Sequence, residues 1–173
     1  MFNEVSSFIR SLYQQPDGFI ALHEPRFYGR EKEYLIDCID TTFVSSTGPY
    51  VDKVGEEIRR ITGAAYAIPI VNGTSALHLA LVAAGVQRND EVLTQALTFV
   101  ATSNAIAYLG AIPHFVDVDT ETLGMSAVLL RNHLNAVAEL KHGVCYNKKT
   151  GRRIAACVPM HTFGIPLQIQ ALA

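Results

Sequence analysis

The segment Ala67–Leu81 joins a short apolar run to a glycine and two hydroxyl residues. The apolar run stops at Asn72 and Gly73, and a helical pattern then begins with Thr74 and Ser75. The start of a helix presents unpaired backbone N–H groups and the positive end of the helix dipole. Together with the two hydroxyls, these donors suit an anion such as phosphate. The sequence therefore predicts a phosphate site formed by Gly73, Thr74 and Ser75.

Ordinary helix capping is the alternative explanation of the same residues. Serine and threonine often begin helices because their hydroxyls accept a hydrogen bond from a backbone N–H group, with no ligand involved. From this segment alone, capping is the better-supported interpretation. The segment contains neither the Gly-Lys-Ser/Thr of a Walker A loop nor G-x-G-x-x-G, so it does not indicate a nucleotide site.

Phe99 occupies a similar place after the next predicted strand. It lies where a strand gives way to a helix, at the carboxyl end of the expected sheet, which is where α/β proteins bind ligands. An aromatic ring at such an edge could stack on a heteroaromatic ligand. The alternative is a core Phe99 with Thr98 as the helix cap, which this segment alone favours.

The remaining candidates are two aspartates and two histidines. Asp117 and Asp119 share a strand face, but a metal site would need a third ligand, so we expect Asp119 to begin a turn. His78 lies in an apolar helix and is expected to be a hydrogen-bonded core residue. His161 directly follows a strand, which makes it a candidate for the edge of the site. The sequence lacks the G-x-S-x-G elbow of many hydrolases.

The order of apolar and polar segments predicts an α/β fold. Strands alternating with helices imply parallel strands joined by right-handed crossovers. We expect the nearly charge-free helix from Gly73 to be buried on both sides. The expected elements are an irregular segment 1–30; helices at 31–42, 49–63, 73–86, 99–109 and 126–140 and one opened by Pro166; strands at 66–71, 91–95, 114–118 and 154–160; and a surface hairpin or loop at 141–153.

Composition limits the classes of partner. The 173 residues carry a formal net charge of −2, which gives no electrostatic reason to expect nucleic acid or an anionic membrane. The longest charge-free apolar stretch, 64–86, is broken by Pro69 and Gly73, so it does not predict a membrane span. Three widely spaced cysteines favour a reducing cytoplasm over a disulfide framework. The chain stops within a helical pattern, and we expect it to be the N-terminal part of a longer enzyme.

Three motifs together carry a family resemblance. VNGTSALHLAL, DEVLTQALTFVATSNAIAYLGAIPHFVDVD and VPMHTFGIP resemble the DegT/DnrJ/EryC1/StrS family of pyridoxal-phosphate-dependent sugar aminotransferases. The resemblance begins near Phe27 and, in HEPRFYGREKEYLIDCIDTTFVSSTGPYVDKVGEEI, is greatest to the LegC-type branch. It implies the large domain of a type I aminotransferase, here residues 31–173 without the rest of the enzyme: a mostly parallel sheet with flanking helices, in a homodimer.

The resemblance also assigns roles to residues. It implies that Thr74 and Ser75, with Gly73, bind the phosphate of pyridoxal phosphate and that Phe99 stacks on the pyridine ring. It places the loop 43–48 near the sugar substrate, which makes substrate candidates of four residues. These are Phe43, Ser45, Thr47 and His161.

One expected part is missing from the sequence. The family uses a lysine that forms a Schiff base with the cofactor and an aspartate that pairs with the pyridine nitrogen. Both follow the segment that matches VPMHTFGIP, so no catalytic residue is assigned in this chain. None of its lysines matches the family's lysine motif. They are Lys32, Lys53, Lys141, Lys148 and Lys149.

The resemblance implies an amino transfer from glutamate to a nucleotide-linked 4-keto sugar in cell-surface amino-sugar biosynthesis. We expect the isolated chain to be inactive and to bind the cofactor weakly or not at all. Two alternatives stay open. The chain could be a non-catalytic module or remnant that dimerises with a full-length homologue, or a fragment of a sugar dehydratase of the same family.

Overall fold

The computed structural model describes residues 2–21 and 23–173. The chain forms two compact units, residues 1–67 and residues 68–173, and each is described here by itself. The division that the sequence predicts, a segment 1–30 and a domain 31–173, stays a prediction. Among the described residues, no helix is both long and apolar enough to cross a membrane.

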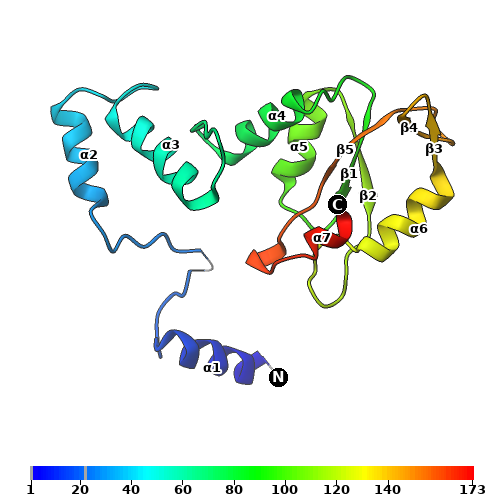
Figure 1. Cartoon of the computed structure of the whole chain (residues 1–173). Helices are drawn as coiled ribbons and strands as arrows, with labels where there is room; N and C mark the ends of the chain where they lie inside the picture. The colour runs from blue at the N-terminus through cyan, green and yellow to red at the C-terminus, as the bar shows by residue number, and fades with distance from the viewer. Residues whose placement is uncertain (1, 22) are drawn as a thin grey trace. The chain divides into compact units, whose positions relative to one another are not determined.

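The first unit contains three helices, α1 (Phe2–Tyr13), α2 (Glu31–Asp40) and α3 (Pro49–Thr62) (Figure 1). Helix α3 confirms the prediction from Pro49, which lies in its first turn, to Gly63, which ends it in a left-handed conformation. Among the described residues of this unit only Gly55 is buried. The three helices therefore lack a core of their own.

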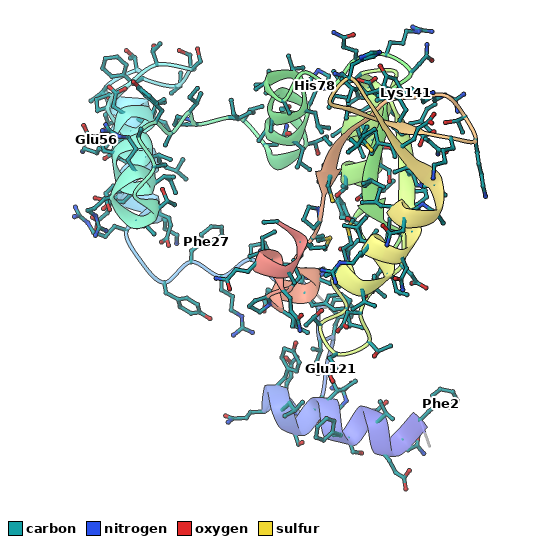
Figure 2. All side chains as sticks on the ribbon, turned by 45° about the vertical axis from the view of Figure 1, so that its right-hand side comes forward. Phe2, Phe27, Glu56, His78, Glu121 and Lys141 are labelled. Atoms are coloured by element: carbon teal, nitrogen blue, oxygen red, sulfur yellow. The ribbon has the colours of Figure 1, made fainter. Side chains whose placement is uncertain are left out.

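Helix α1 corrects the prediction of an irregular segment at 1–30. Its apolar side chains recur every three or four residues, which is a helical spacing that the sequence analysis missed. The side chain of Phe2 projects away from the helix (Figure 2), and it is exposed, as are Phe8 and Leu12. The turn signals at Pro16 and Gly18 mark only the end of this helix.

The second unit is built on a parallel three-stranded sheet in the order β2-β1-β5. Its strands are β2 (Ile112–Val116), β1 (Glu91–Gln95) and β5 (Ile154–Val158). All five residues of β1 are buried because both faces of this central strand are covered. The predicted α/β fold with a parallel sheet is confirmed.

Helices cover both faces of this sheet (Figure 1). Helices α4 (Gly73–Ala83) and α5 (Val100–Tyr108) pack on one face, where Leu81 and Ile106 belong to the same buried cluster as Val92. Helix α6 (Ala127–Val137) packs on the other, where Leu130 meets Leu93. The remaining elements are the antiparallel hairpin β3 (Ala138–Lys141) and β4 (Val144–Asn147), the 3-10 turn η1 (Thr162–Gly164) and the short helix α7 (Ile169–Leu172).

The predicted strand at 66–71 does not form. A strand needs a hydrogen-bonded neighbour, and among the described residues this segment pairs with none; Tyr66, Ile68 and Val71 are exposed. The expectation that α4 is buried on both sides is wrong as well. One face of α4 packs on the sheet, whereas Leu79 and Val82 on other faces are exposed.

Several predicted boundaries shift by a few residues. The second strand occupies Ile112–Val116 instead of 114–118, and Val118 makes only an isolated bridge with Met125. The helix predicted to reach residue 140 ends at Val137, because the next four residues form the first strand of the hairpin. Pro166 does not open the last helix, which begins at Ile169.

Candidate functional site

Asn72 caps the start of helix α4. Its backbone is extended, and its Oδ1 accepts a hydrogen bond of 2.8 Å from the N–H group of Ser75. The residue that caps this helix is therefore Asn72, and the capping explanation of Thr74 and Ser75 is wrong in this structure. The sequence offered the signal, because asparagine is among the best capping residues.

Capping by Asn72 leaves a set of donors without partners. Within residues 2–21 and 23–173, the N–H groups of Gly73 and Thr74 and the hydroxyls of Thr74 and Ser75 make no hydrogen bond. A Cβ atom added to Gly73 would meet no atom within 4 Å, so the space beside this helix start is open. Two backbone donors, two hydroxyls and the helix dipole make a donor set that fits a phosphate group.

His78, one turn further along α4, is not the hydrogen-bonded core histidine that the sequence predicts. Its Nδ1 is buried and has no hydrogen-bond partner among the described residues. Its ring lies 6.3 Å from the ring of Tyr108, measured between centroids. Figure 2 labels His78 on this helix. An open pocket of about 400 Å³ lies here and is lined by Thr74, Ser75, His78, Leu79 and Tyr108.

Phe99 lies at the carboxyl end of β1 and at the N-cap position of α5. Its side chain is 72% exposed, so the alternative of a core phenylalanine is wrong for this chain. The hydroxyl of Thr98 instead contacts the hydroxyl of Thr102 at 2.8 Å and donates to the sulfur of Met160. Phe99 is not among the residues that line the pocket at the start of α4, and its contact with a cofactor ring stays a prediction.

His161 also lies at the carboxyl end of the sheet, directly before η1. Its side chain is exposed, and its Nδ1 accepts a hydrogen bond of 3.1 Å from the N–H group of Leu167. Phe43, Ser45 and Thr47 belong to the first unit, in the loop between α2 and α3. Their contact with a sugar substrate stays a prediction.

Asp119 begins a turn, as the sequence predicts. Its Oδ1 accepts hydrogen bonds from the N–H groups of Glu121 and Thr122, and these bonds hold the pKa of its carboxyl below the ordinary value. Asp117 accepts from the N–H group of Val118. Both carboxylates are thus engaged with nearby backbone, and in the described part of the chain no three His, Cys, Asp or Glu side chains form a metal-binding group.

The amino end of the sheet holds a polar cluster that the sequence analysis missed. Glu91 is buried, with 4% of its side chain exposed; its carboxylate lies 3.9 Å from Nη1 of Arg152 and makes hydrogen bonds with three other side chains. It contacts Nδ1 of His114 at 2.7 Å and accepts from Asn147 at 2.8 Å and from Thr150 at 2.6 Å. Burial alone raises the pKa of the Glu91 carboxyl, but these hydrogen bonds outweigh it and hold that pKa below its ordinary value.

This cluster attaches the hairpin to the sheet. His114 also contacts His133 of α6, with 2.6 Å between their Nε2 atoms. Next to Glu91, Arg153 donates to both carboxylate oxygens of Asp90. A glutamate at the start of a predicted strand was the available sequence signal, since a buried carboxylate needs partners. Three of the five lysines lie on the hairpin or just after it, at 141, 148 and 149.

A profile of the DegT/DnrJ/EryC1/StrS aminotransferase family matches residues 26–173. The chain belongs to this family. The resemblance that the three motifs carry is thereby confirmed, and with it membership of a pyridoxal-phosphate-dependent aminotransferase family.

Two curated relatives of this DegT/DnrJ/EryC1/StrS chain are GDP-perosamine synthases. The protein of Escherichia coli O157:H7 is 45% identical over 108 residues, which are 62% of this chain and 30% of the relative. The protein of Vibrio cholerae is 37% identical over 153 residues, or 88% of this chain and 37% of the relative. The chain thus spans about a third of the length of these relatives.

Solved structures of the family share the fold. DesI, solved in the presence of its TDP-sugar product, matches with a TM-score of 0.69 at 24% identity, over 94% of this chain and 38% of DesI. The putative sugar aminotransferase Spr1654 from Streptococcus pneumoniae, in its PMP-form, matches with a TM-score of 0.68 at 23% identity. The match covers 88% of this chain and 34% of Spr1654. At these identities the likeness concerns the fold, and it confirms the predicted α/β fold with a parallel sheet and flanking helices.

Proposed function

We propose that this chain is the cofactor-binding N-terminal part of an aminotransferase that acts on a nucleotide-linked 4-keto sugar, with glutamate as amino donor. The observation that carries the proposal is the family match over residues 26–173. The GDP-perosamine synthase relatives and the TDP-sugar product of DesI support a nucleotide sugar as substrate. The resemblance extends the proposal to cell-surface amino-sugar biosynthesis, a homodimer and a cytoplasmic location.

The residues at the start of α4 would hold pyridoxal phosphate by its phosphate. When bound, the cofactor supplies an electron-accepting ring through which an amino group is exchanged. In this proposal the N–H groups of Gly73 and Thr74 and the hydroxyls of Thr74 and Ser75 donate to the phosphate oxygens. The exposed ring of Phe99 lies against the pyridine ring and orients it. These residues bind and orient, and none of them transfers a proton.

We further propose that the isolated chain does not catalyse transamination. Lys32 and Lys53 belong to α2 and α3 of the first unit. The other three lysines lie at or beside the hairpin, whose Asn147 bonds to Glu91 at the amino end of the sheet. That end is opposite to the carboxyl end, where Phe99 lies. No lysine of the second unit is therefore close to the proposed ring site.

A comparison of this chain with a chimera tests the proposal. The chimera joins the chain to the remainder of the Vibrio cholerae GDP-perosamine synthase that follows the matched residues. With pyridoxal phosphate, glutamate and a GDP-linked 4-keto sugar, we expect the chimera to form an amino sugar and the chain alone to form none. The same chimera with Thr74→Val and Ser75→Ala serves as a control and should need far more cofactor for activity. Turnover by the chain alone would contradict the proposal, as would a folded, cofactor-loaded chimera without activity.

A further inference from the structure

Gln95 is the last residue of β1 and is completely buried at the carboxyl end of the sheet. Its side-chain amide reaches two loops that follow different strands. The Nε2 group donates to the carbonyl of Leu97 and to the hydroxyl of Thr162, both at 2.9 Å. Its Oε1 accepts a hydrogen bond of 3.2 Å from the N–H group of Met160.

A third segment joins the same network through Leu123, which has a left-handed backbone with φ of 56°. That conformation is unfavourable for leucine and needs support from its surroundings. The carbonyl of Leu123 accepts a hydrogen bond of 2.8 Å from Thr162 and lies 3.1 Å from Nε2 of Gln95. The turn after β2 is thus held to the loops after β1 and β5.

The network requires an amide at position 95 and a hydroxyl at position 162. Thr162 uses its one proton toward Leu123, so its oxygen is free to accept from Gln95. Gln95 must donate on one side and accept on the other, which neither a carboxylate nor an apolar side chain can do. Thr162 is also buried, so these bonds have no competing water.

Two exposed aromatic side chains extend from the loops that Gln95 joins. Phe99 follows Leu97 by two residues, and Phe163 follows Thr162 directly. Phe163 is 80% exposed and has a left-handed backbone with φ of 54°. Neither ring is fixed by a core, so their positions depend on how firmly the loops are held.

We propose that Gln95 is a positioning residue for the cofactor ring: its amide joins the loops after β1 and β5 and thereby fixes the backbone that carries Phe99 and Phe163. The inference rests on the proposed function, since it takes pyridoxal phosphate as the ligand at this edge. It assigns to Gln95 no contact with the cofactor. The ring is oriented by the loops, and the loops are oriented by the amide.

Thr94 is a matched control on the same strand. It is completely buried as well, and its hydroxyl donates a hydrogen bond of 2.9 Å to the carbonyl of Val158. This bond joins two strands and reaches no loop residue that carries an exposed ring. Thr94→Val and Gln95→Leu each remove buried hydrogen bonds from β1, but only Gln95→Leu releases the loops.

The test uses pyridoxamine phosphate, which lacks the aldehyde and so does not attach to surface lysines. We expect Gln95→Leu to weaken its binding to the full chain about tenfold, equal to about 1.4 kcal/mol, and Thr94→Val to leave it within about twofold. At saturating ligand, the induced circular dichroism of the bound ring should be smaller in Gln95→Leu. A purely structural role does not change this signal at saturation. Thr162→Ser, which keeps the hydroxyl, should retain both affinity and signal, and Thr162→Val should lose them.

The outcomes separate this inference from the proposed function. If the unmodified chain does not bind pyridoxamine phosphate even as part of the chimera, the cofactor site itself is refuted for this chain. If it binds, and Gln95→Leu binds with the same affinity and the same induced signal, the positioning role is refuted. If Gln95→Leu does not fold, the comparison of Thr162→Val with Thr162→Ser tests the positioning role instead. Both variants change only Thr162, the partner of Gln95 in the hydrogen bond, and only Thr162→Val removes the hydroxyl.

Discussion

Glu91 and Gln95 stand at opposite ends of β1, and both are buried, yet their surroundings differ in kind. Glu91 is held by His114 of β2 and by the side chains of Asn147 and Thr150, with Arg152 3.9 Å from its carboxylate, and Asp90 beside it pairs with Arg153. Gln95 is held by neutral bonds to loops. Figure 2 shows the two ends clearly, with Lys141 of the hairpin at one and Glu121 of the turn after β2 at the other.

The comparison indicates a division of roles within one small sheet. At the amino end, the carboxylates of Asp90 and Glu91 are already bound by neighbouring side chains, so few of their oxygen atoms are available to a ligand. At the carboxyl end, a neutral network holds the loops while the exposed rings of Phe99 and Phe163 remain available. This matches the general preference of α/β proteins to bind ligands at the carboxyl ends of parallel strands.

Removal of the Glu91 carboxylate should have the largest effect. Glu91→Ala leaves His114, Asn147 and Thr150 without their acceptor, and we expect it to lower the free energy of unfolding by about 3 kcal/mol. Urea denaturation followed by circular dichroism measures this. The matched control is Glu139→Ala, which breaks only the surface pair with Lys141 and should cost less than about 1 kcal/mol. If both variants lowered the free energy of unfolding equally, the stabilising role assigned to the buried Glu91 carboxylate would be contradicted.

The pH dependence of stability should come from the amino end. The pKa of the Glu91 carboxyl lies below its ordinary value of 4.5 in the folded chain. Its contribution is therefore fully present above that value and is lost as the pH falls through the folded pKa. The pKa of Asp90 is lowered too: burial acts against this, but the Arg153 and Gln87 hydrogen bonds outweigh it.

Glu91→Gln should thus destabilise most near neutral pH and progressively less in acid. Thermal midpoints of both proteins from pH 7 to about pH 3 test this. Gln95→Leu provides the contrast, because its network contains no ionisable group and its effect should not vary with pH. A cost of Glu91→Gln that grows on acidification would contradict the assignment of the stabilising charge to Glu91.

Overpacking at the carboxyl end should have an intermediate effect. A Cβ on Gly124 would lie 2.5 Å from Cβ of Leu167, so Gly124→Ala must displace the turn after β2. We expect a loss of about 2 kcal/mol in the free energy of unfolding. Gly73→Ala is the control, because a Cβ there meets nothing within 4 Å. If both variants were equally stable, the close approach of these loops would be disproved.

The smallest change in stability should come from Phe99. Its side chain is exposed, so Phe99→Ala should alter the free energy of unfolding by less than about 0.5 kcal/mol. The same variant should bind pyridoxamine phosphate more weakly, because the stacking surface is lost. Parallel unfolding and binding measurements separate the two effects. A large loss of stability would instead identify Phe99 as a core residue.

The sequence predicted the regular parts of the second unit well, because periodicity and capping are local. Strand β1 occupies the predicted residues, and α5 and α6 begin within one residue of the predicted positions. The strand at 66–71 failed because its apolar pattern says nothing about whether a partner strand is within reach. Helix α1 was missed although its spacing was helical.

The candidate site was predictable only in part. The donors at Gly73, Thr74 and Ser75 follow from helix geometry, although the cap is Asn72. The bond between Gln95 and Thr162 joins residues 67 positions apart, and only the parallel pairing of β1 with β5 brings them together. Hydrogen bonds of this kind depend on the topology of the sheet, so a local sequence pattern does not predict them.

The most direct test of the account compares pyridoxamine phosphate with pyridoxamine, which lacks the phosphate. We expect the chain to bind the phosphorylated ligand at least about tenfold more tightly, since several donors at the start of α4 bond to the phosphate. We also expect Thr74→Val with Ser75→Ala to remove most of this preference. Equal affinities for the two ligands in the unmodified chain would contradict the assignment of this helix start to the cofactor phosphate.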